Sequence, residues 1–315
     1  MAEAVALGAE ARGTTAPNPN VGCVIVSDGQ PVGRGATEAG GRPHAEAVAI
    51  GAAGERVGGA TLYTTLEPCA HRSTRGPDCA GLIVAAGPAR VVAALRDPDP
   101  RTDGEGFARL RAAGIDVTVG VGEDQAARSL EGFLSRIRRG RPFVTLKLAL
   151  SIDGKIALPS GESKWITGVE ARAHVHQERA RADMILVGRG TYEADRPSLD
   201  VRLPGIEHRS PSRALLTRGA PVPGWTCLAS PQGVHELHDV NDLLVEGGSG
   251  AASAFLTADL VDRLLIYRAP ILIGEGRSSV GYIGLSDLAD AHGRWQLAET
   301  RALGMDRLEV YERVR

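Results

Sequence analysis

The order of apolar segments over the first 140 residues constrains the fold most strongly. Residues 21–29 form an apolar, β-rich segment that ends in an Asp28-Gly29 turn, from which residues 30–38 can return as a hairpin partner. The elements expected next are a helix at 44–54, a strand at 60–68, a helix at 79–87, a strand at 90–98, a helix at 104–114 and a strand at 115–121. This alternation predicts an α/β domain in which helices pack on a mainly parallel sheet.

A second domain is expected after a basic junction marked by glycine and proline. Residues 124–142 have the composition of a closing helix that runs into this junction, and a new series of strands begins at Phe143. With 315 residues and 43% hydrophobic composition, the chain is long enough for two domains with separate cores. We therefore place the boundary near residue 141, with domains at 1–140 and 141–315.

Charge and cysteine content narrow the class of protein. A formal net charge of -2 argues against an electrostatic nucleic-acid binder, and no apolar run reaches the roughly 18 residues that a spanning helix needs. Residues 1–12 lack a basic leader and a cleavage site. We therefore expect a cytoplasmic protein that binds neither nucleic acid nor membranes. Four cysteines are too few for a disulfide scaffold, and the closely spaced Cys69 and Cys79 favour a metal site.

Two short motifs contain the groups that a catalytic zinc site requires. His44 and Glu46 lie two positions apart at an expected helix start, and Cys69 and Cys79 follow in a segment rich in Gly and Pro. Catalytic zinc takes three protein ligands and leaves a position for water, so His44, Cys69 and Cys79 could bind it. Glu46 would then be free to move protons. Unpaired N–H groups at helix starts would stabilise the thiolates.

This pattern resembles the zinc-dependent nucleobase deaminases, whose signature is H-x-E followed by P-C-x-x-C. Nine residues separate Cys69 from Cys79 here, and this longer loop resembles the riboflavin-biosynthesis deaminase, in which T-L-E-P-C-S-H-H-G-R-T-P-P-C occupies the same place. The chain keeps E-P-C, His71 and the closing cysteine. It has one extra residue, and Arg72 stands where a second histidine is usual.

The resemblance covers nearly the whole chain. Similar blocks occur at residues 16–26, 41–50, 97–121, 130–157, 160–202 and 243–274. The chain is identified as a member of the bifunctional deaminase/reductase family of riboflavin biosynthesis. Membership implies an N-terminal cytidine-deaminase-like α/β/α domain with zinc and a C-terminal dihydrofolate-reductase-like α/β domain that uses NADPH.

The resemblance also implies the two reactions. The first is zinc-dependent hydrolytic deamination of 2,5-diamino-6-ribosylamino-4(3H)-pyrimidinone 5′-phosphate, and the second is reduction of the ribose to give 5-amino-6-(5-phosphoribitylamino)uracil. One alternative is a deaminase with an inactive reductase-like domain, which would release ammonia without oxidising NADPH. Another is a non-catalytic flavin-precursor-binding protein with structural zinc. Glu46 argues against the latter, because a structural zinc needs no proton shuttle.

In the second domain, an apolar strand that ends in glycines precedes an expected helix. Backbone N–H groups at the start of such a helix can hold a cofactor phosphate. The resemblance assigns cofactor contacts to Ala149, Trp165, Thr191, Asp195, Gly248, Ser249, Gly250, Ala251, Ala252, Ser253 and Ala254. It assigns substrate contacts to Ser163, Arg179, Leu199, Arg202 and Glu246. Arginines suit a substrate with a 5′-phosphate, and Lys147 and Asp153 are further candidates for lining the site.

Two departures from the family pattern lead to expectations. Asp195-Arg196-Pro197 replaces D-D-P or D-N-P, which predicts an unusual positive charge at the pocket entrance. The stretch between residues 213–225 and 243–248 is shorter than in the family, so a helix on one sheet face is expected to be reduced or missing. An uncovered apolar face would be covered by a second copy, which predicts a homodimer through the second domain.

Overall fold

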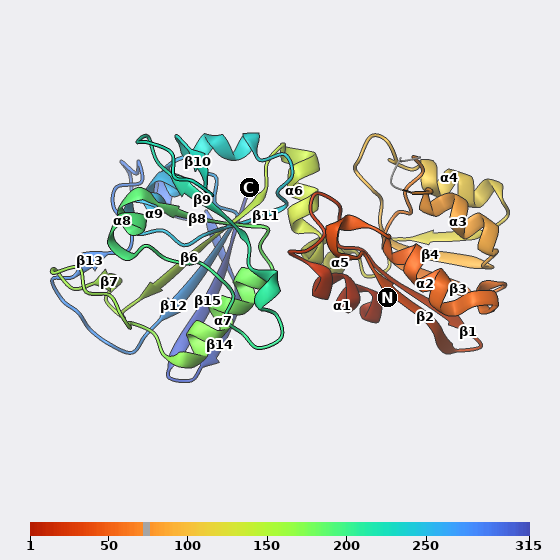
Figure 1. The fold of residues 1–315 in the computed structure, drawn as a ribbon, viewed down its shortest axis with the longest axis horizontal. Helices are drawn as coiled ribbons and strands as arrows, with labels where there is room; N and C mark the ends of the chain where they lie inside the picture. The colour runs from red at the N-terminus through yellow and green to blue at the C-terminus, as the bar shows by residue number, and fades with distance from the viewer. Residues whose placement is uncertain (72–75) are drawn as a thin grey trace. The chain divides into compact units, whose positions relative to one another are not determined.

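The computed structural model describes residues 1–71 and 76–315, and the expectation for Arg72 lies outside these residues. The chain divides into two compact units, Met1–Gly140 and Arg141–Arg315, each with its own sheet and core (Figure 1). Among the helices of the described residues, none has both the length and the apolar character that crossing a membrane requires.

The first unit is built on a five-stranded sheet with the order β2-β1-β3-β4-β5. The strands are β1 (Gly22–Ser27), β2 (Gln30–Ala36), β3 (Thr61–Leu66), β4 (Arg90–Leu95) and β5 (Asp116–Val119). β1 pairs antiparallel with β2 and β3, whereas β3, β4 and β5 are parallel. The expectation of a mainly parallel sheet therefore holds for β3, β4 and β5, and the pairing of β1 with β3 departs from it. The tight turn at Asp28 and Gly29, both with positive φ, places β1 and β2 side by side as the expected hairpin.

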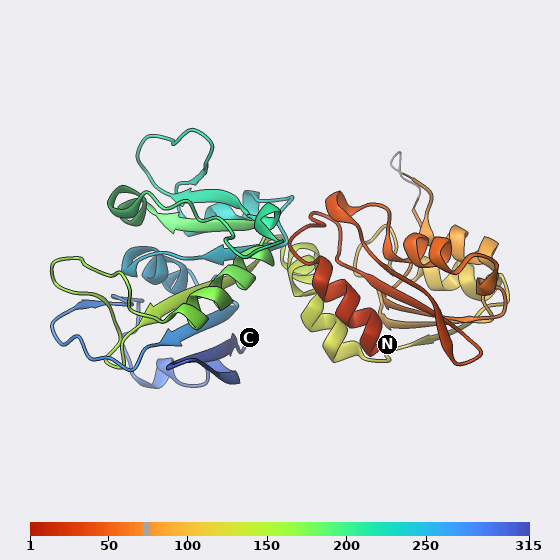
Figure 2. The same ribbon diagram turned by 60° about the horizontal axis from the view of Figure 1, so that its bottom comes forward.

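Six α-helices surround this sheet in the described residues. They are α1 (Ala2–Ala11), α2 (Ala45–Ala53), α3 (Cys79–Ala86), α4 (Glu105–Ala112), α5 (Glu123–Ser129) and α6 (Glu131–Arg139), with short 3₁₀ helices at Ala39–Gly41 and Gly54–Val57. The single closing helix that was expected is thus two helices that meet at Leu130. Figure 2 shows α1 lying beside the α5–α6 pair.

Glycines let α1 and α2 approach the β1–β2 hairpin from opposite faces. A Cβ at Gly22 would lie 1.8 Å from the carbonyl oxygen of Ala4 in α1, and a Cβ at Gly35 would lie 2.3 Å from that of Ala45 in α2. Gly35 pairs with Cys23, the neighbour of Gly22, so the two glycines face opposite sides. The close contact at Gly35 holds the first turn of α2 against the sheet. Cys23 is fully buried in the core, as expected.

The second unit contains an eight-stranded sheet with the order β10-β9-β8-β11-β6-β12-β15-β14. The strands are β6 (Phe143–Leu150), β8 (Met184–Gly188), β9 (Ser212–Leu216), β10 (Thr226–Leu228), β11 (Asp242–Val245), β12 (Arg263–Arg268), β14 (Trp295–Leu303) and β15 (Asp306–Arg313). The first six strands in the sheet order are parallel to one another. β15 runs antiparallel to both of its neighbours, β12 and β14. β7 (Lys155–Ala157) and β13 (Arg277–Ser278) form a separate pair.

Helices cover both faces of this sheet. They are α7 (Val169–Ala180), α8 (Arg189–Asp195) and α9 (Ser249–Thr257), with 3₁₀ helices η3 (Glu207–Arg209), η4 (Pro231–Glu236) and η5 (Ala289–Ala291). Leu265 and Tyr267 of β12 pack with residues of α7, whereas Leu264 belongs to the cluster that contains Phe255 of α9. Because side chains alternate along a strand, α7 and α9 lie on opposite faces.

The shortened stretch between β10 and β11 holds η4 and no α-helix among its residues, all of which are described. The face beneath it is nevertheless covered, because Val234, Leu237 and Val240 are each less than 9% exposed and pack into the core. The expected reduction of a helix is therefore found. The expectation of an uncovered apolar face is wrong, because the short 3₁₀ helix η4 and the residues after it supply enough apolar side chains to cover this face of the sheet.

Candidate active sites

His44, Cys69 and Cys79 lie together in the first unit. Their ligand atoms are all within 4.8 Å of one another. Nδ1 of His44 is 3.3 Å from Sγ of Cys79 and 3.6 Å from Sγ of Cys69. One imidazole nitrogen and two sulfurs are a donor set that suits zinc, and three protein ligands leave a fourth position open. The three residues therefore fit a catalytic zinc ion.

Two helix starts hold these residues in place. His44 is the N-cap of α2, and Cys79 is the first residue of α3. The α3 N-cap Asp78 accepts a hydrogen bond of 2.7 Å from the N–H of Gly81 and pairs with Arg109 at 2.8 Å. Cys69 lies in the loop after β3 and not at a helix start, which corrects the sequence expectation. Its Sγ still accepts the N–H of Cys79 at 3.3 Å, so the start of α3 stabilises it.

The electrostatics of Cys69 and Cys79 favour a thiolate at Cys69. A hydrogen bond from the Cys79 side chain lowers the pKa of Cys69 to about 4, against the effect of burial and with help from His44. The same hydrogen bond, together with burial and the charge of Glu46, raises the pKa of Cys79. An anionic sulfur beside an imidazole nitrogen offers the ligands that a zinc ion prefers.

Glu46 lies two residues after His44 in the first turn of α2 and is only 3% exposed. It is not one of the three grouped ligands. Burial raises the pKa of Glu46, and His44 partly opposes this rise. A buried carboxyl group with a raised pKa holds a proton more readily than an exposed one and can both accept and return it. Glu46 is therefore placed to transfer protons beside the ligand group.

Sequence reasoning missed the acidic segment that follows β4. Asp97 and Asp99 are both less than 9% exposed, and the N–H of Asp99 donates to the Asp97 carboxylate at 2.9 Å. Burial raises the pKa of Asp97 to about 7, and the charge of Cys69 adds to the rise. Asp97 therefore lies within electrostatic reach of the ligand group. The available signal was the D-P-D-P sequence directly after a parallel strand, since such strand ends line ligand sites.

A cavity of about 730 Å³ opens in the second unit at the carboxyl ends of β6, β8 and β11. Ligands of open α/β sheets bind at these strand ends. Twelve residues that the resemblance assigned line the cavity: Ala149, Ser163, Trp165, Arg179, Thr191, Asp195, Arg202, Glu246, Gly248, Ser249, Gly250 and Ala251. Lys147 lines it as well.

Other expected residues lie elsewhere. Leu199 is 4% exposed in an apolar cluster with Leu215, and Ala252 is fully buried in the core. Ser253 accepts the N–H of Gly281 at 2.8 Å, and Ala254 lines a neighbouring pocket. Residues 248–254 cannot all face one cavity, because 249–254 are helical and their side chains point in different directions.

Two further expectations concern the pocket. Asp153 is not among the residues that line it, and its carboxylate accepts the Ser151 hydroxyl and the N–H of Gly274. Arg196 is exposed directly after the lining residue Asp195 and does not itself line the pocket, so a positive charge at the entrance stays a prediction. The ion pair at this edge joins Lys164 and Asp195 at 3.4 Å.

An ion cluster forms the polar end of the cavity. Glu246 is paired with Arg179 at 2.7 Å and with Lys147 at 3.6 Å. Burial would raise the pKa of Glu246, but Lys147 and Arg179 together lower it to about 2. Trp165 is 68% exposed, and the guanidinium of Arg172 lies 4.6 Å from its ring centroid. The cavity thus combines a fixed carboxylate with cations and a flat aromatic surface.

The glycine turn before α9 leaves room for a phosphate-bearing cofactor. A Cβ at Gly247 would lie 2.4 Å from Cβ of Ala251, so only glycine permits this turn. The N–H of Gly248 donates to Thr191 at 3.1 Å, which fixes the turn beside α8. The start of α9 therefore faces the cavity without side chains in the way, as a pyrophosphate requires.

Comparisons with known proteins cover the full chain. Residues 1–95 match the cytidine and deoxycytidylate deaminase zinc-binding region, and residues 142–308 match the RibD C-terminal domain. The riboflavin biosynthesis protein RibD of Haemophilus influenzae is 39% identical over 97% of this chain and 94% of that protein. The RibD of Escherichia coli is 40% identical over 97% and 96%.

Solved structures agree in fold. Acinetobacter baumannii RibD matches with a TM-score of 0.91 and 36% identity, over 100% of this chain and 98% of that chain. A diaminohydroxyphosphoribosylaminopyrimidine deaminase/5-amino-6-(5-phosphoribosylamino)uracil reductase from Thermotoga maritima matches with a TM-score of 0.90 and 32% identity, over 100% and 97%. With a zinc-binding deaminase domain followed by an NADPH-using reductase domain, the chain belongs to the RibD family of bifunctional riboflavin-biosynthesis enzymes.

Proposed function

We propose that residues 1–140 hydrolyse the 2-amino group of 2,5-diamino-6-ribosylamino-4(3H)-pyrimidinone 5′-phosphate. Residues 141–315 then reduce the ribose of the product with NADPH, giving 5-amino-6-(5-phosphoribitylamino)uracil. The observation that carries this proposal is the buried Glu46 beside the grouped His44, Cys69 and Cys79. The name of the Thermotoga maritima relative supports the choice of substrates.

In the first reaction, His44, Cys69 and Cys79 would hold zinc, which when bound supplies a Lewis acid that activates water. Glu46 accepts a proton released from the attacking water and delivers it to the leaving amine. Water supplies the oxygen of the new carbonyl, and the amino group departs as ammonia. The raised pKa of Glu46 suits both halves of this transfer.

In the second reaction, NADPH when bound supplies a hydride to the sugar carbon, and the ring oxygen must gain a proton as the ribose opens. Lys147 is placed to give this proton, because its ammonium is half-buried in the cavity and held by Glu246. Arg202 and Ser163 line the same cavity and supply donors for the 5′-phosphate. Trp165 offers a flat face for a ring.

One assay tests both halves. The purified protein should release ammonia from the diaminopyrimidine substrate and oxidise about one NADPH for each ammonia released. Ammonia release without NADPH oxidation would point to an inactive second unit. A protein that does neither while binding the substrate would favour the non-catalytic alternative.

The ion cluster of the cavity should make the second unit sensitive to acid. Glu246→Gln should destabilise it by about 3 kcal/mol at pH 7, because Lys147 and Arg179 stay largely buried without their carboxylate. The folded pKa of Glu246 is depressed to about 2, so its contribution is present above about pH 4.5 and is lost as pH falls toward 2.

Denaturant unfolding of wild type and Glu246→Gln at a series of pH values measures this contribution. The stability difference should be largest at neutral pH and shrink below about pH 4.5. The exposed Glu275→Gln serves as the control and should match wild type throughout. Equal stability of wild type and Glu246→Gln at pH 7 would contradict the prediction.

We also propose that the enzyme is a homodimer joined through the second unit. Support comes from the edge strand β14 and not from the face beneath η4. Seven of the nine residues of β14 are exposed, so both of its faces are open to solvent. The unpaired backbone groups of an exposed edge strand can pair with another chain. Light scattering at micromolar concentration should give about twice the chain mass, and a monomer that still reduces substrate would refute the dimer alone.

We place the enzyme in the cytoplasm. Within the described residues all four cysteines are free thiols, and Cys69 and Cys79 must stay reduced to bind a metal. Reducing conditions of this kind are those of the cytosol.

A further inference from the structure

Trp165 is an exposed aromatic residue in the wall of the cavity in the second unit. It lies in the segment between β7 and α7, and its side chain lines the cavity together with that of Lys147. The guanidinium of Arg172 lies over the indole ring, with its Cζ atom 4.6 Å from the ring centroid. One face of the indole is therefore covered by a cation, and the opposite face is left for a ligand.

Arg172 holds the indole from a fixed helix. It belongs to the first turn of α7, and the start of this helix is anchored because the N–H of Gly168 donates to the Asp306 carboxylate at 2.6 Å. The Nη1 atom of Arg172 also donates to the carbonyl oxygen of Thr167. Arg172 thus contacts both the backbone and the ring of the segment that carries Trp165. A cation–π contact of this kind fixes the orientation of the ring.

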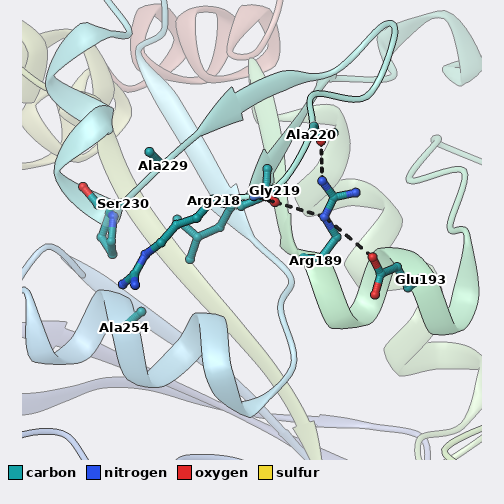
Figure 3. A pocket seen from close by; sticks show the side chains of 11 residues that line it. Arg189, Glu193, Arg218, Gly219, Ala220, Ala229, Ser230 and Ala254 are labelled. Atoms are coloured by element: carbon teal, nitrogen blue, oxygen red, sulfur yellow. Dashed lines mark hydrogen bonds and ion pairs between the residues drawn. The ribbon is translucent and has the colours of Figure 1, made fainter.

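The charge of Arg172 is balanced differently from that of its neighbours. Three other arginines of the cavity wall have a carboxylate partner: Arg179 with Glu246, Arg202 with Asp200, and Arg189 with Glu193. Figure 3 shows the last of these pairs. Within residues 1–71 and 76–315, the Arg172 side chain has no such partner, and its contacts are the Thr167 carbonyl and the Trp165 ring. Its positive charge therefore acts on the indole without a counter-charge.

The nicotinamide ring of the cofactor changes its charge during the reduction. The ring is neutral in NADPH, and it becomes positively charged in NADP⁺ when its hydride passes to the sugar carbon and the sugar's ring oxygen gains a proton. A cation on one face of an indole draws π-electron density toward itself, so the opposite face attracts a second cation less strongly. The free face of Trp165 is thus better suited to a neutral ring than to a cationic one.

We propose that Arg172 is a positioning residue that acts through Trp165. It holds the indole so that the free face stacks on the nicotinamide ring, and its charge favours NADPH over NADP⁺. The inference rests on the proposed function, because it assumes that the second unit reduces its substrate with NADPH. A preference for the reduced ring lets the enzyme exchange spent NADP⁺ for NADPH after each turnover.

Calorimetric titration of the full chain with NADPH and with NADP⁺ tests the proposal. The two cofactors share every group except the redox state of the nicotinamide, so the ratio of their affinities isolates this ring. Arg172→Met keeps a long side chain against the indole but removes the charge. It should lower the NADPH/NADP⁺ affinity ratio roughly two- to fivefold, the range of a cation–π contact at an exposed site. Arg172→Lys keeps the charge and should restore most of the ratio.

A double-mutant cycle shows whether Arg172 acts through the indole. Trp165→Leu alone should lower the ratio by a similar factor, and it should fold normally because Trp165 is exposed. Adding Arg172→Met to Trp165→Leu should change the ratio no further. The matched control is Arg213→Met, which removes a guanidinium 5.2 Å from the ring centroid of Trp225, outside the residues that line the cavity. It should keep the wild-type ratio.

Three results would overturn the inference. If Arg172→Met keeps the wild-type ratio, its charge plays no part, and a raised KM for the deaminated substrate would assign the face of Trp165 to the pyrimidine. If Arg172→Met lowers the ratio equally with and without Trp165, the guanidinium acts on the cofactor directly. Both results leave the proposed function intact. Failure of wild type to bind NADPH at all would reject the proposed function and the inference with it.

Discussion

Glu46→Gln should lower the rate of deamination by roughly two to four orders of magnitude while the zinc stays bound. Glutamine keeps the size and hydrogen-bonding capacity of the side chain but cannot accept a proton. The three grouped ligand residues are unchanged, and Glu46 is not one of them. Ammonia release from the diaminopyrimidine substrate measures the rate, and elemental analysis measures the metal.

Two controls separate this effect from a general loss of structure. Glu55→Gln changes an exposed glutamate shortly after α2 and should deaminate at the wild-type rate. Reduction of supplied deaminated substrate by Glu46→Gln should be unchanged, because the second unit has a core of its own. A Glu46→Gln enzyme that deaminates normally would refute the role assigned to the first turn of α2. Loss of zinc in this variant would instead make Glu46 a ligand.

The features that were predicted well depend on residues that lie close together in the sequence. The Asp28-Gly29 turn determines the β1–β2 hairpin, and Gly54 and Gly87 end α2 and α3 as expected. The grouping of His44, Cys69 and Cys79 was predictable for a chemical reason, because one imidazole and two thiols suit a catalytic zinc ion. Local chemistry of this kind can be read without knowing what packs against it.

The features that the sequence could not predict depend on segments far apart in the chain. Every strand of the first sheet was expected, but the antiparallel pairing of β3 with β1 was not. Leu199 could be aligned with a substrate contact but packs into an apolar cluster. Burial of Asp97 follows from tertiary packing, and the D-P-D-P sequence marks only its position after a strand.

Cys79→Ser should abolish both zinc binding and deamination, with metal content falling from about one zinc per chain to nearly none. Serine lacks the thiolate ligand, and its hydroxyl does not ionise near neutral pH. Because zinc then keeps only two of its three protein ligands, we expect deamination to fall by at least about three orders of magnitude.

The chain offers a matched control in Cys227, a half-buried free cysteine of the second unit. Cys227→Ser should keep both zinc and deamination, which excludes a general effect of cysteine removal. Cys79→Ser should still reduce supplied deaminated substrate with NADPH at the wild-type rate, since the second unit folds around separate clusters. If Cys79→Ser retains zinc and deaminates, the ligand group must lie elsewhere. If it loses reduction as well, the two units are not independent, and the assignment of one reaction to each fails.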